Sequence, residues 1–359
     1  MRDDPRLLQI QQARQRVLQG DASASEALVG QWYERAWIER SWRRCLARGQ
    51  RPEQPIGFDV VSAAARRRSE EAHRTLLTAA RPELQRLARA VAPIRYFAIL
   101  TDAEGTVVDT AGAIDRADQR ADAIARVGVD LSERSIGTSA IGAALGEQQP
   151  VWLHRGEHFF RDTAVYSCAG APLLGPTGRC VGMLDLTGIE APERPELQHL
   201  VARSARVIED ALTLATPHAL RLRLGWADAL PGEDADALLC LDADGQVRGA
   251  NRAARQMLPA LQALAHAPLH ADELFALPWA ALASRAGGEP LAVPLWSGLR
   301  VALQVQRPAD DAARRTPLKA LEAELIRQAV RDSGGNVDQA ARRLGLSRAT
   351  VYRRLAAAR

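Results

Sequence analysis

Lysine is nearly absent from this sequence, because Lys319 is the only one in 359 residues. A phosphate-binding loop of the form G-x-x-x-x-G-K-[ST] uses a lysine amine to reach the β- and γ-phosphates of a nucleotide. Lys319 follows Thr-Pro-Leu and no glycine-rich loop. The sequence therefore excludes a P-loop ATPase in this chain.

Cysteines and long apolar runs are also scarce. The four cysteines, Cys45, Cys168, Cys180 and Cys240, have neither the spacing of a disulfide framework nor that of a metal site. No apolar run approaches the length of a membrane span, and Met1–Pro5 opens directly into charge. These features predict a cytoplasmic protein without a signal peptide or membrane partner, and we assign it no catalytic residue, metal ligand or cofactor.

The composition is that of an ordinary globular chain, with 47% hydrophobic and 25% charged residues over a length that allows two or three domains. Charge, however, is unevenly distributed. Residues 314–359 hold 11 Lys or Arg and four Asp or Glu, whereas the whole chain has a net charge of only +4. A basic end on a near-neutral body predicts a polyanionic partner for that end.

The basic end also predicts two short helices joined by a tight turn. Asn336 is placed to cap the first helix, and Gly345 stands where a helix ends in a left-handed residue. Ser347 is the next N-cap, and the second helix would bury Val351 and Leu355. This pattern is typical of a DNA-reading helix-turn-helix. The alternative, an amphipathic hairpin with a solvated arginine face, is disfavoured by the local surplus of positive charge.

This segment resembles the Fis-type helix-turn-helix that ends many bacterial enhancer-binding regulators. The resemblance rests on Gly335-Asn336, Ala340-Ala341, Leu344-Gly345-Leu346-Ser347-Arg348-x-Thr350 and Arg353-Arg354-Leu355, preceded by a packing helix at Leu318–Asp332. It implies a DNA-binding domain at 317–359 that acts on double-stranded DNA as a homodimer. We expect phosphate contacts from Ser347 and Thr350, base contacts from Arg348, Tyr352 and Arg353, and backbone attraction from Arg342, Arg343 and Arg354.

At the other end, residues 1–94 predict a helical lead-in. Arg6–Leu18 and Glu26–Ala47 carry apolar residues at three- and four-residue steps. Asp59 is expected to cap a third helix and Pro82 to open a fourth.

Short strands replace this pattern from Tyr96 onward. Residues 96–100 and 106–109 flank a turn at Asp102–Gly105. Further strand candidates are 151–153, 170–174 and 180–187, the last two joined by the turn signal Gly175-Pro-Thr-Gly178, and a helix is expected at 197–214. We therefore predict a multidomain α+β protein with a sensory-type domain at 95–215.

This region resembles the GAF sensor of acetoin catabolism regulators. The resemblance covers about residues 35–214 and rests on Ser41-Trp42-Arg43-Arg44-Cys45, Glu133-Arg-Ser-Ile136-Gly137-Thr138-Ser139-Ala-Ile-Gly142, Gly156-Glu157-His158-Phe159, Cys168-Ala-Gly-Ala-Pro172 and Gly182-Met-Leu-Asp185. It implies a GAF-like domain that binds a small organic effector. Ser139 stands where the family usually has Asn, so the resemblance implies the fold and not the same ligand.

Candidate ligand-binding residues cluster after one strand of this domain. Trp152 and Phe159 offer apolar walls, and His154, Glu157, His158 and Cys168 offer polar groups, the mixture that a small polar ligand requires. Equally, His158 and Phe159 could simply fill the sheet. The spacing H-x-x-E-H also occurs in zinc proteases, but there it needs both histidines on one helical face, whereas Gly156 and the following phenylalanines favour a strand edge.

A second sensor unit is predicted at 225–306. Leu238–Leu241, the turn Asp242–Gly245 and Gln246–Gly249 form a hairpin, and Asn251 then begins a helix. This order resembles the start of a PAS domain, with later strands expected at 291–293 and 299–306. Residues 307–316 are polar, contain Pro308, are followed by Pro317 and predict a linker.

Together these features predict a ligand-responsive bacterial transcription regulator. Relatives of the acetoin type place an ATPase between sensor and helix-turn-helix and use it to remodel the sigma-54 polymerase, whereas residues 307–316 leave no room for one. We therefore expect DNA occupancy to be the output, with RNA polymerase or a sigma-54 activator as a candidate further partner. The alternative is an accessory or architectural DNA-binding protein that modulates a complete sigma-54 regulator.

Overall fold

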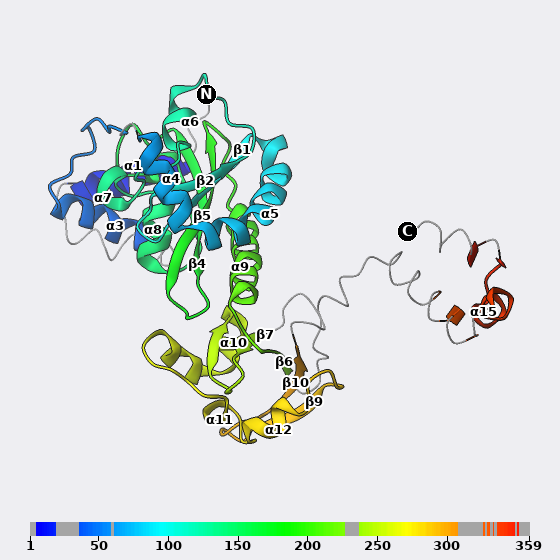
Figure 1. The fold of residues 1–359 in the computed structure, drawn as a ribbon. Helices are drawn as coiled ribbons and strands as arrows, with labels where there is room; N and C mark the ends of the chain where they lie inside the picture. The colour runs from blue at the N-terminus through cyan, green and yellow to red at the C-terminus, as the bar shows by residue number, and fades with distance from the viewer. Residues whose placement is uncertain are drawn as a thin grey trace.

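A computed structural model of the chain describes residues 5–18, 36–58, 61–226 and 237–307, and, nearer the C-terminus, 326, 329–330, 333, 336–348 and 350–351. It contains two five-stranded sheets flanked by helices, followed by a small helical segment (Figure 1). The predicted multidomain α+β class is confirmed.

The first sheet is antiparallel with the strand order β2-β1-β5-β4-β3. Its hairpins lie where the turn signals predict them, because Asp102 Oδ1 accepts hydrogen bonds from the backbone N–H groups of Glu104 and Thr106 and so closes the β1–β2 turn. The strands are β1 Tyr96–Thr101, β2 Val107–Ala111, β3 Val151–His154, β4 Tyr166–Leu174 and β5 Cys180–Ile189.

Both faces of this sheet are covered, as strand β1 illustrates. All six of its residues are buried. Alternate side chains point to opposite faces: Phe97 and Ile99 belong to one apolar cluster, whereas Tyr96, Ala98 and Leu100 belong to the other. Helices α5 (Arg74–Val91) and α9 (Leu197–Ala215) pack on the second of these faces (Figure 1).

The other face carries the N-terminal helices together with three helices from the middle of the chain. Helices α1 (Pro5–Leu18) and α3 (Ala36–Ala47) contribute Ile10, Trp37 and Trp42 to the same cluster as Phe97. The remaining helices here are α6 Gln119–Ile124, α7 Glu133–Ile136 and α8 Ala140–Glu147.

Two expectations for the N-terminal helices are wrong. The segment predicted as one helix from Asp59 forms two, α4 (Ala63–Ala72) and α5, and Ser62 caps the first of them; Asp59 itself lies outside the described residues. Pro82 does not open a helix but lies inside α5. An internal proline costs about 3 kcal/mol, which the burial of eight α5 side chains offsets.

The second sheet has the strand order β8-β7-β6-β10-β9 and is also antiparallel. Its hairpin β7–β8, the following helix with Asn251 as N-cap, and the late hairpin β9–β10 lie where they are predicted. The elements are β6 Leu220–Trp226, β7 Ala237–Leu241, β8 Val247–Ala250, α10 Arg252–Met257, η4 Pro259–Ala265, α11 Ala271–Leu274, α12 Trp279–Ala283, β9 Leu291–Pro294 and β10 Arg300–Gln306.

Its central strand was not predicted. Strand β6 reads Leu-Arg-Leu-Arg-Leu-Gly-Trp, an alternation that places Leu220, Leu222 and Leu224 in the core and the arginines on the opposite face. In the first sheet the central strand is the last in sequence, whereas in the second it is the first. The two sheets therefore share a spatial arrangement but take their central strand from different places in the chain.

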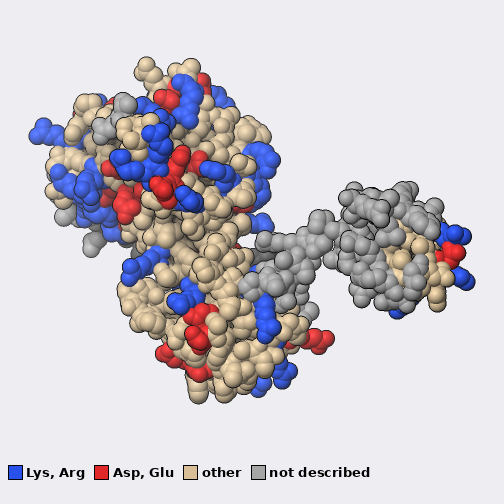
Figure 2. Space-filling view, in the orientation of Figure 1, with Lys and Arg blue, Asp and Glu red and all other residues tan. Residues whose placement is uncertain are grey.

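The visible surface mixes basic and acidic side chains around the first sheet (Figure 2), where pairs such as Arg120 with Glu190 and Arg40 with Glu147 form at 2.8 and 2.5 Å. None of the helices that the structure describes is both long enough and apolar enough to span a bilayer.

Candidate functional site

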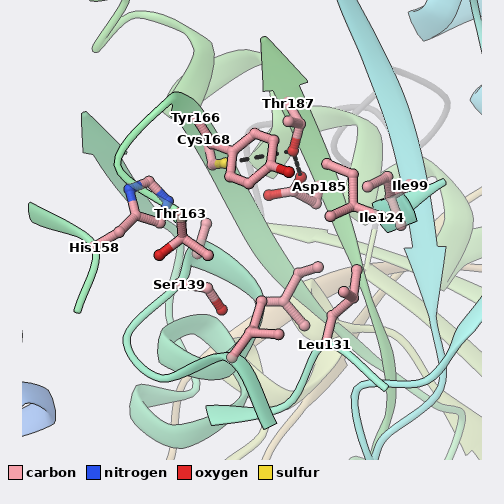
Figure 3. A pocket seen from close by; sticks show the side chains of 13 residues that line it. Ile99, Ile124, Leu131, Ser139, His158, Thr163, Tyr166, Cys168, Asp185 and Thr187 are labelled. Atoms are coloured by element: carbon pink, nitrogen blue, oxygen red, sulfur yellow. Dashed lines mark hydrogen bonds between the residues drawn. The ribbon is translucent and has the colours of Figure 1, made fainter. Parts of the chain in front are cut away.

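A small cavity lies against the first sheet on its α8 face (Figure 3). Its volume is only about 20 Å³. That is room for about one water molecule, so a larger ligand must move the lining. The lining comprises Ile99, Ile124, Leu131, Ile136, Ser139, Ala140, Ile141, His158, Thr163, Tyr166, Cys168, Asp185 and Thr187.

A carboxylic acid lies at the sheet side of this cavity. Asp185 on β5 is 1% exposed, and its Oδ2 accepts a hydrogen bond from Thr187 Oγ1 at 2.5 Å. Its Oδ1 has no hydrogen-bond partner within the described part of the chain. Burial raises the pKa of Asp185 to about 7, an effect that the hydrogen bond from Thr187 only partly opposes. Asp185 can therefore be neutral near physiological pH.

A neutral histidine lines the cavity from the segment after β3. His158 Nδ1 lies 2.9 Å from the carbonyl oxygen of Arg155, so Nδ1 must be the donor and Nε2 the acceptor. Burial lowers the pKa of His158 to about 4. Nε2 has no hydrogen-bond partner in the residues that the structure describes. His158 and Asp185, which both line the cavity, thus each carry a buried polar atom without a hydrogen-bond partner among the described residues.

Cys168 and Ser139 are further polar residues of the lining. Cys168 on β4 lies opposite Thr187 on β5, with its Sγ 3.3 Å from Thr187 Oγ1. Burial and the neighbouring Asp185 raise the pKa of the Cys168 thiol, so it stays protonated. Ser139 lines the cavity and also caps α8, since its Oγ accepts from Gly142 N at 3.1 Å. Isoleucine and leucine side chains form the apolar part of the wall.

Of the six residues predicted to bind a ligand, the structure brings His158 and Cys168 to the cavity. His154 and Glu157 instead brace η3 (Arg155–Glu157): Glu157 Oε2 accepts from His154 N at 2.7 Å, and His154 Nδ1 lies 2.7 Å from Ser167 Oγ. The segment is a short 3₁₀ turn after a strand, as the glycine in it suggests.

The two predicted apolar walls lie elsewhere. Phe159 is 1% exposed and packs in the core, where its Cβ would lie 2.9 Å from a Cβ added at Gly137. Gly137 also has φ +63°, a conformation that favours glycine. Trp152 packs with the cluster on the opposite face of the sheet, beneath α5 and α9.

Two distant sequence motifs meet beside the cavity. Glu133 on α7 accepts hydrogen bonds from Ser41 at 2.6 Å, from Arg44 at 2.9 and 2.7 Å, and from Arg48 at 2.8 Å. Burial alone would raise the pKa of Glu133, but the hydrogen bonds from Arg44, Ser41 and Arg48 prevail and lower it. This carboxylate therefore fastens α3 to the loop that carries Ser139.

A second contact ties the same helices to the segment that carries His158. Trp42 Nε1 donates to the carbonyl oxygen of Glu157 at 2.9 Å. Arg14 donates to the carbonyl oxygens of Gly156 and His158 at 3.2 and 3.1 Å. Both loops that close the cavity are thus held from outside by the N-terminal helices.

Sequence reasoning missed Asp185, Thr187, Thr163 and Tyr166 as site residues. One signal was available: the run Gly182-Met-Leu-Asp-Leu is apolar except for its aspartate, which is therefore buried in a central strand. Burial of a carboxyl group is costly, so a buried aspartate indicates a site residue. Among the described residues, no group of three or more His, Cys, Asp or Glu side chains is arranged to hold a metal ion.

The second candidate site is the C-terminal helix pair. Helix α15 (Val337–Leu344) begins at Asn336, whose side chain accepts from Asp338 N and Gln339 N at 3.1 Å, and it ends at Gly345 with φ +66°. Ser347 Oγ accepts from Thr350 N at 3.1 Å and so caps the next helical turn. The three predicted caps are confirmed.

A small core holds this pair together. Ile326, Ala341 and Val351 are buried and come from three successive segments, in agreement with a packing helix before α15. Arg342, Arg343, Ser347 and Arg348 are exposed. The Arg348 guanidinium forms an ion pair with Asp338 near the start of α15. Tyr352, Arg353 and Arg354, as well as Lys319 and most of 318–332, lie outside the described residues.

Comparison with known proteins gives two family matches. Residues 317–357 match "Bacterial regulatory protein, Fis family", and residues 9–210 match "MimR, N-terminal domain". The acetoin catabolism regulatory protein of Cupriavidus necator is 32% identical over 234 residues, which cover 62% of this chain and 34% of that protein. The propane 2-monooxygenase operon transcriptional activator MimR of Mycolicibacterium smegmatis is 30% identical over 199 residues, covering 55% and 31%.

The chain thus spans about a third of the length of these curated relatives. Among solved structures, the Escherichia coli DhaR(N)–DhaL complex aligns with a TM-score of 0.46 at 17% identity, over 74% of this chain and 98% of that one. The match over residues 9–210 covers more than half of this sequence. The chain therefore belongs to the family defined by the MimR N-terminal domain, joined here to a Fis-family helix-turn-helix.

Proposed function

We propose that this protein is a cytoplasmic, homodimeric transcription regulator that binds DNA through residues 317–359 and responds to a small uncharged organic molecule in the cavity of the first sheet. One observation carries the proposal: a chain with a Fis-family match also has a cavity whose lining residues Asp185 and His158 each carry a buried polar atom that is unpartnered among the described residues. Buried polar groups without partners are costly, so a ligand that hydrogen-bonds to both would stabilise the protein.

The chemistry of the lining supports an uncharged ligand with at least one hydroxyl group. Asp185 would accept a hydrogen bond when ionised and can donate one when protonated, and neutral His158 Nε2 would accept one. None of the thirteen lining residues, all of them described, is Lys or Arg. A carboxylate or phosphate would therefore meet no compensating charge. Trp152, His154, Glu157 and Phe159 would support the cavity from outside it.

The output would be DNA occupancy. Only residues 307–316 separate the second sheet from the Fis-family match, and no phosphate-binding loop occurs in the sequence. We therefore propose that the protein acts without an ATPase of its own, by blocking, recruiting or bending DNA. The DNA-bound protein would then contact RNA polymerase or a separate sigma-54 activator.

The ligand proposal predicts a selective rise in thermal stability. Small uncharged alcohols and hydroxyketones at 100 times their dissociation constant should add about 2.7 kcal/mol of stability, whereas carboxylates of equal size should add none. Cys168→Val fills part of the cavity and should abolish the rise. Cys180→Val, on the same hairpin but away from the cavity, serves as its control. Equal shifts with both variants would place the ligand elsewhere.

The DNA proposal predicts that variants of the two partners in one ion pair, Arg348 and Asp338, differ in how well they discriminate an operator from random DNA. Arg348→Ala should cost about 1–3 kcal/mol of discrimination between an operator and random DNA, because arginine pairs with guanine edges. Asp338→Asn frees Arg348 from its partner and should retain that discrimination. Footprinting on the DNA upstream of the gene should show a discrete palindromic protection. Diffuse coverage would favour the architectural alternative, and an equal loss on all sequences would make Arg348 a phosphate contact.

A further inference from the structure

The β4–β5 hairpin reaches from the cavity to the second sheet (Figure 1). At one end Cys168 and Thr187 face each other across the hairpin and line the cavity. At the other end Leu174 pairs with Cys180, just before the turn. Leu174 follows Cys168 by six positions along β4, which is about 20 Å at the usual rise of an extended chain. One end of the hairpin therefore lines the cavity, and the other end lies about 20 Å away from it.

A buried carboxylate fastens the turn end of the hairpin. Glu209 on α9 is 1% exposed, and its Oε1 accepts from the backbone N–H of Leu174 at 2.8 Å. The same carboxylate accepts a bidentate pair from Arg252, the first residue of α10, at 2.6 and 3.1 Å. Glu209 therefore joins the end of β4 in the first sheet to a helix of the second.

The turn itself also touches the second sheet. The carbonyl oxygen of Pro176 accepts a hydrogen bond from Ala250 N at 2.8 Å, and a Cβ added at Gly249 would lie 2.9 Å from Pro176 Cβ. Arg179 donates to the carbonyl oxygen of Ala265 at 2.7 and 3.1 Å. Asn251 Nδ2 donates to Asp210 Oδ1 at 2.8 Å, which adds a contact with α9. These contacts surround the pair formed by Glu209 and Arg252.

We infer that the β4–β5 hairpin is a lever that carries a change in the cavity to the second sheet, with Glu209 and Arg252 as its attachment. The inference rests on the proposed sensor function for its biological meaning. Its physical reason is the cost of separation: Leu174 at the end of β4 is bonded to Glu209 on α9, and if the hairpin and α9 moved without α10, this buried carboxylate would lose Arg252, its charged partner, which is strongly unfavourable. The second sheet must therefore follow the hairpin.

Hydrogen exchange of the full chain, read by mass spectrometry, tests this lever without ligand or DNA. Thr187→Val removes the hydrogen bond to Asp185 at the cavity end. We expect it to raise exchange in the cavity strands and also, by about tenfold, in peptides that cover α10. In the Arg252→Gln background the effect on the cavity strands should remain, whereas the effect of Thr187→Val on α10 should disappear.

Two further variants keep the test decisive. Arg248→Gln removes an arginine of β8 that pairs with Asp242 within its own hairpin, and it should leave transmission to α10 intact. Glu209→Gln keeps an oxygen for Leu174 N but removes the charge, and it serves if Arg252→Gln does not fold. Transmission that persists in the Arg252→Gln and Glu209→Gln backgrounds, or that is absent with the attachment intact, would overturn the lever. A failed ligand screen would overturn only the proposed sensor.

Discussion

Asp185→Asn is expected to raise the free energy of unfolding at pH 8 by on the order of 4 kcal/mol, because the wild-type carboxylate must be ionised inside the protein at that pH. Burial raises the pKa of Asp185 from an ordinary value of 3.8 to about 7. Between these two values the folded protein holds a proton that the unfolded chain releases. Wild-type stability therefore falls as the pH rises from about 4 to about 7 and is level above that.

The asparagine variant lacks this fall, so its advantage should shrink steadily as the pH is lowered. Urea unfolding of both proteins at pH 8, 6 and 5 measures the effect, and the carboxamide keeps an oxygen for Thr187. Asp242→Asn is a control of the opposite sign: although burial would raise the pKa of Asp242, hydrogen bonds from Gln246 N, Asp244 N and Arg248 lower it, so this variant should be less stable at pH 8. An Asp185→Asn gain that did not change with pH would contradict a protonated Asp185.

Local signals in the sequence predicted the elements that local interactions build. Asn336, Gly345 and Ser347 are caps because each satisfies backbone groups within three residues of itself. Asp102 and Asp242 form hairpin turns in the same way, since each accepts hydrogen bonds from residues two and four positions ahead. Such patterns can be read without knowledge of the rest of the chain.

The cavity could not be read in this way because its lining comes from distant segments. Ile99 and Asp185 come from paired strands, and Ser139 and His158 come from two separate loops. The residues around His158 predicted its place at the edge of a loop. Trp152 was also predicted to line the site, but successive residues of a strand point to opposite faces, and Trp152 faces the side of the sheet opposite the cavity. Strand β6 has a clear alternation of leucine and arginine, which the sequence reasoning did not use.

The contacts of Glu133 were predictable only in part: both motifs were recognised in the sequence, but the contact between them was not. Ser41 and Arg44 belong to one short motif and Glu133 to another, about 90 residues later. The sequence suggested that both matter for the sensor fold. Only the structure shows that one carboxylate, with a side chain 10% exposed, gathers Ser41, Arg44 and Arg48 and so holds α3 beside the cavity.

Glu133→Gln should therefore lower the free energy of unfolding by about 2–3 kcal/mol at pH 7, since breaking a buried ion pair costs about 3–5 kcal/mol and water can solvate the half-exposed Arg44 and Arg48 in part. The lost stability should also be pH-dependent in the wild-type protein. Because the pKa of Glu133 is lowered in the fold, its contribution is present above the ordinary value of 4.5 and is lost as the pH falls below it.

Urea unfolding at pH 7 and pH 4 measures the difference between Glu133→Gln and wild type, which should narrow at the lower pH. Glu147→Gln is the matched control, because Glu147 pairs with Arg40 and Arg44 at the other end of α8 but receives no hydrogen bond from Ser41. We expect that variant to lose less than 1 kcal/mol, roughly the value of a partly exposed pair. Limited proteolysis adds a local readout: Glu133→Gln should expose α3 to cleavage more than Glu147→Gln does, because Glu133 binds Ser41, Arg44 and Arg48 together. Equal losses in the two variants would mean that charge near α3, and not the buried attachment at Glu133, holds the helix in place.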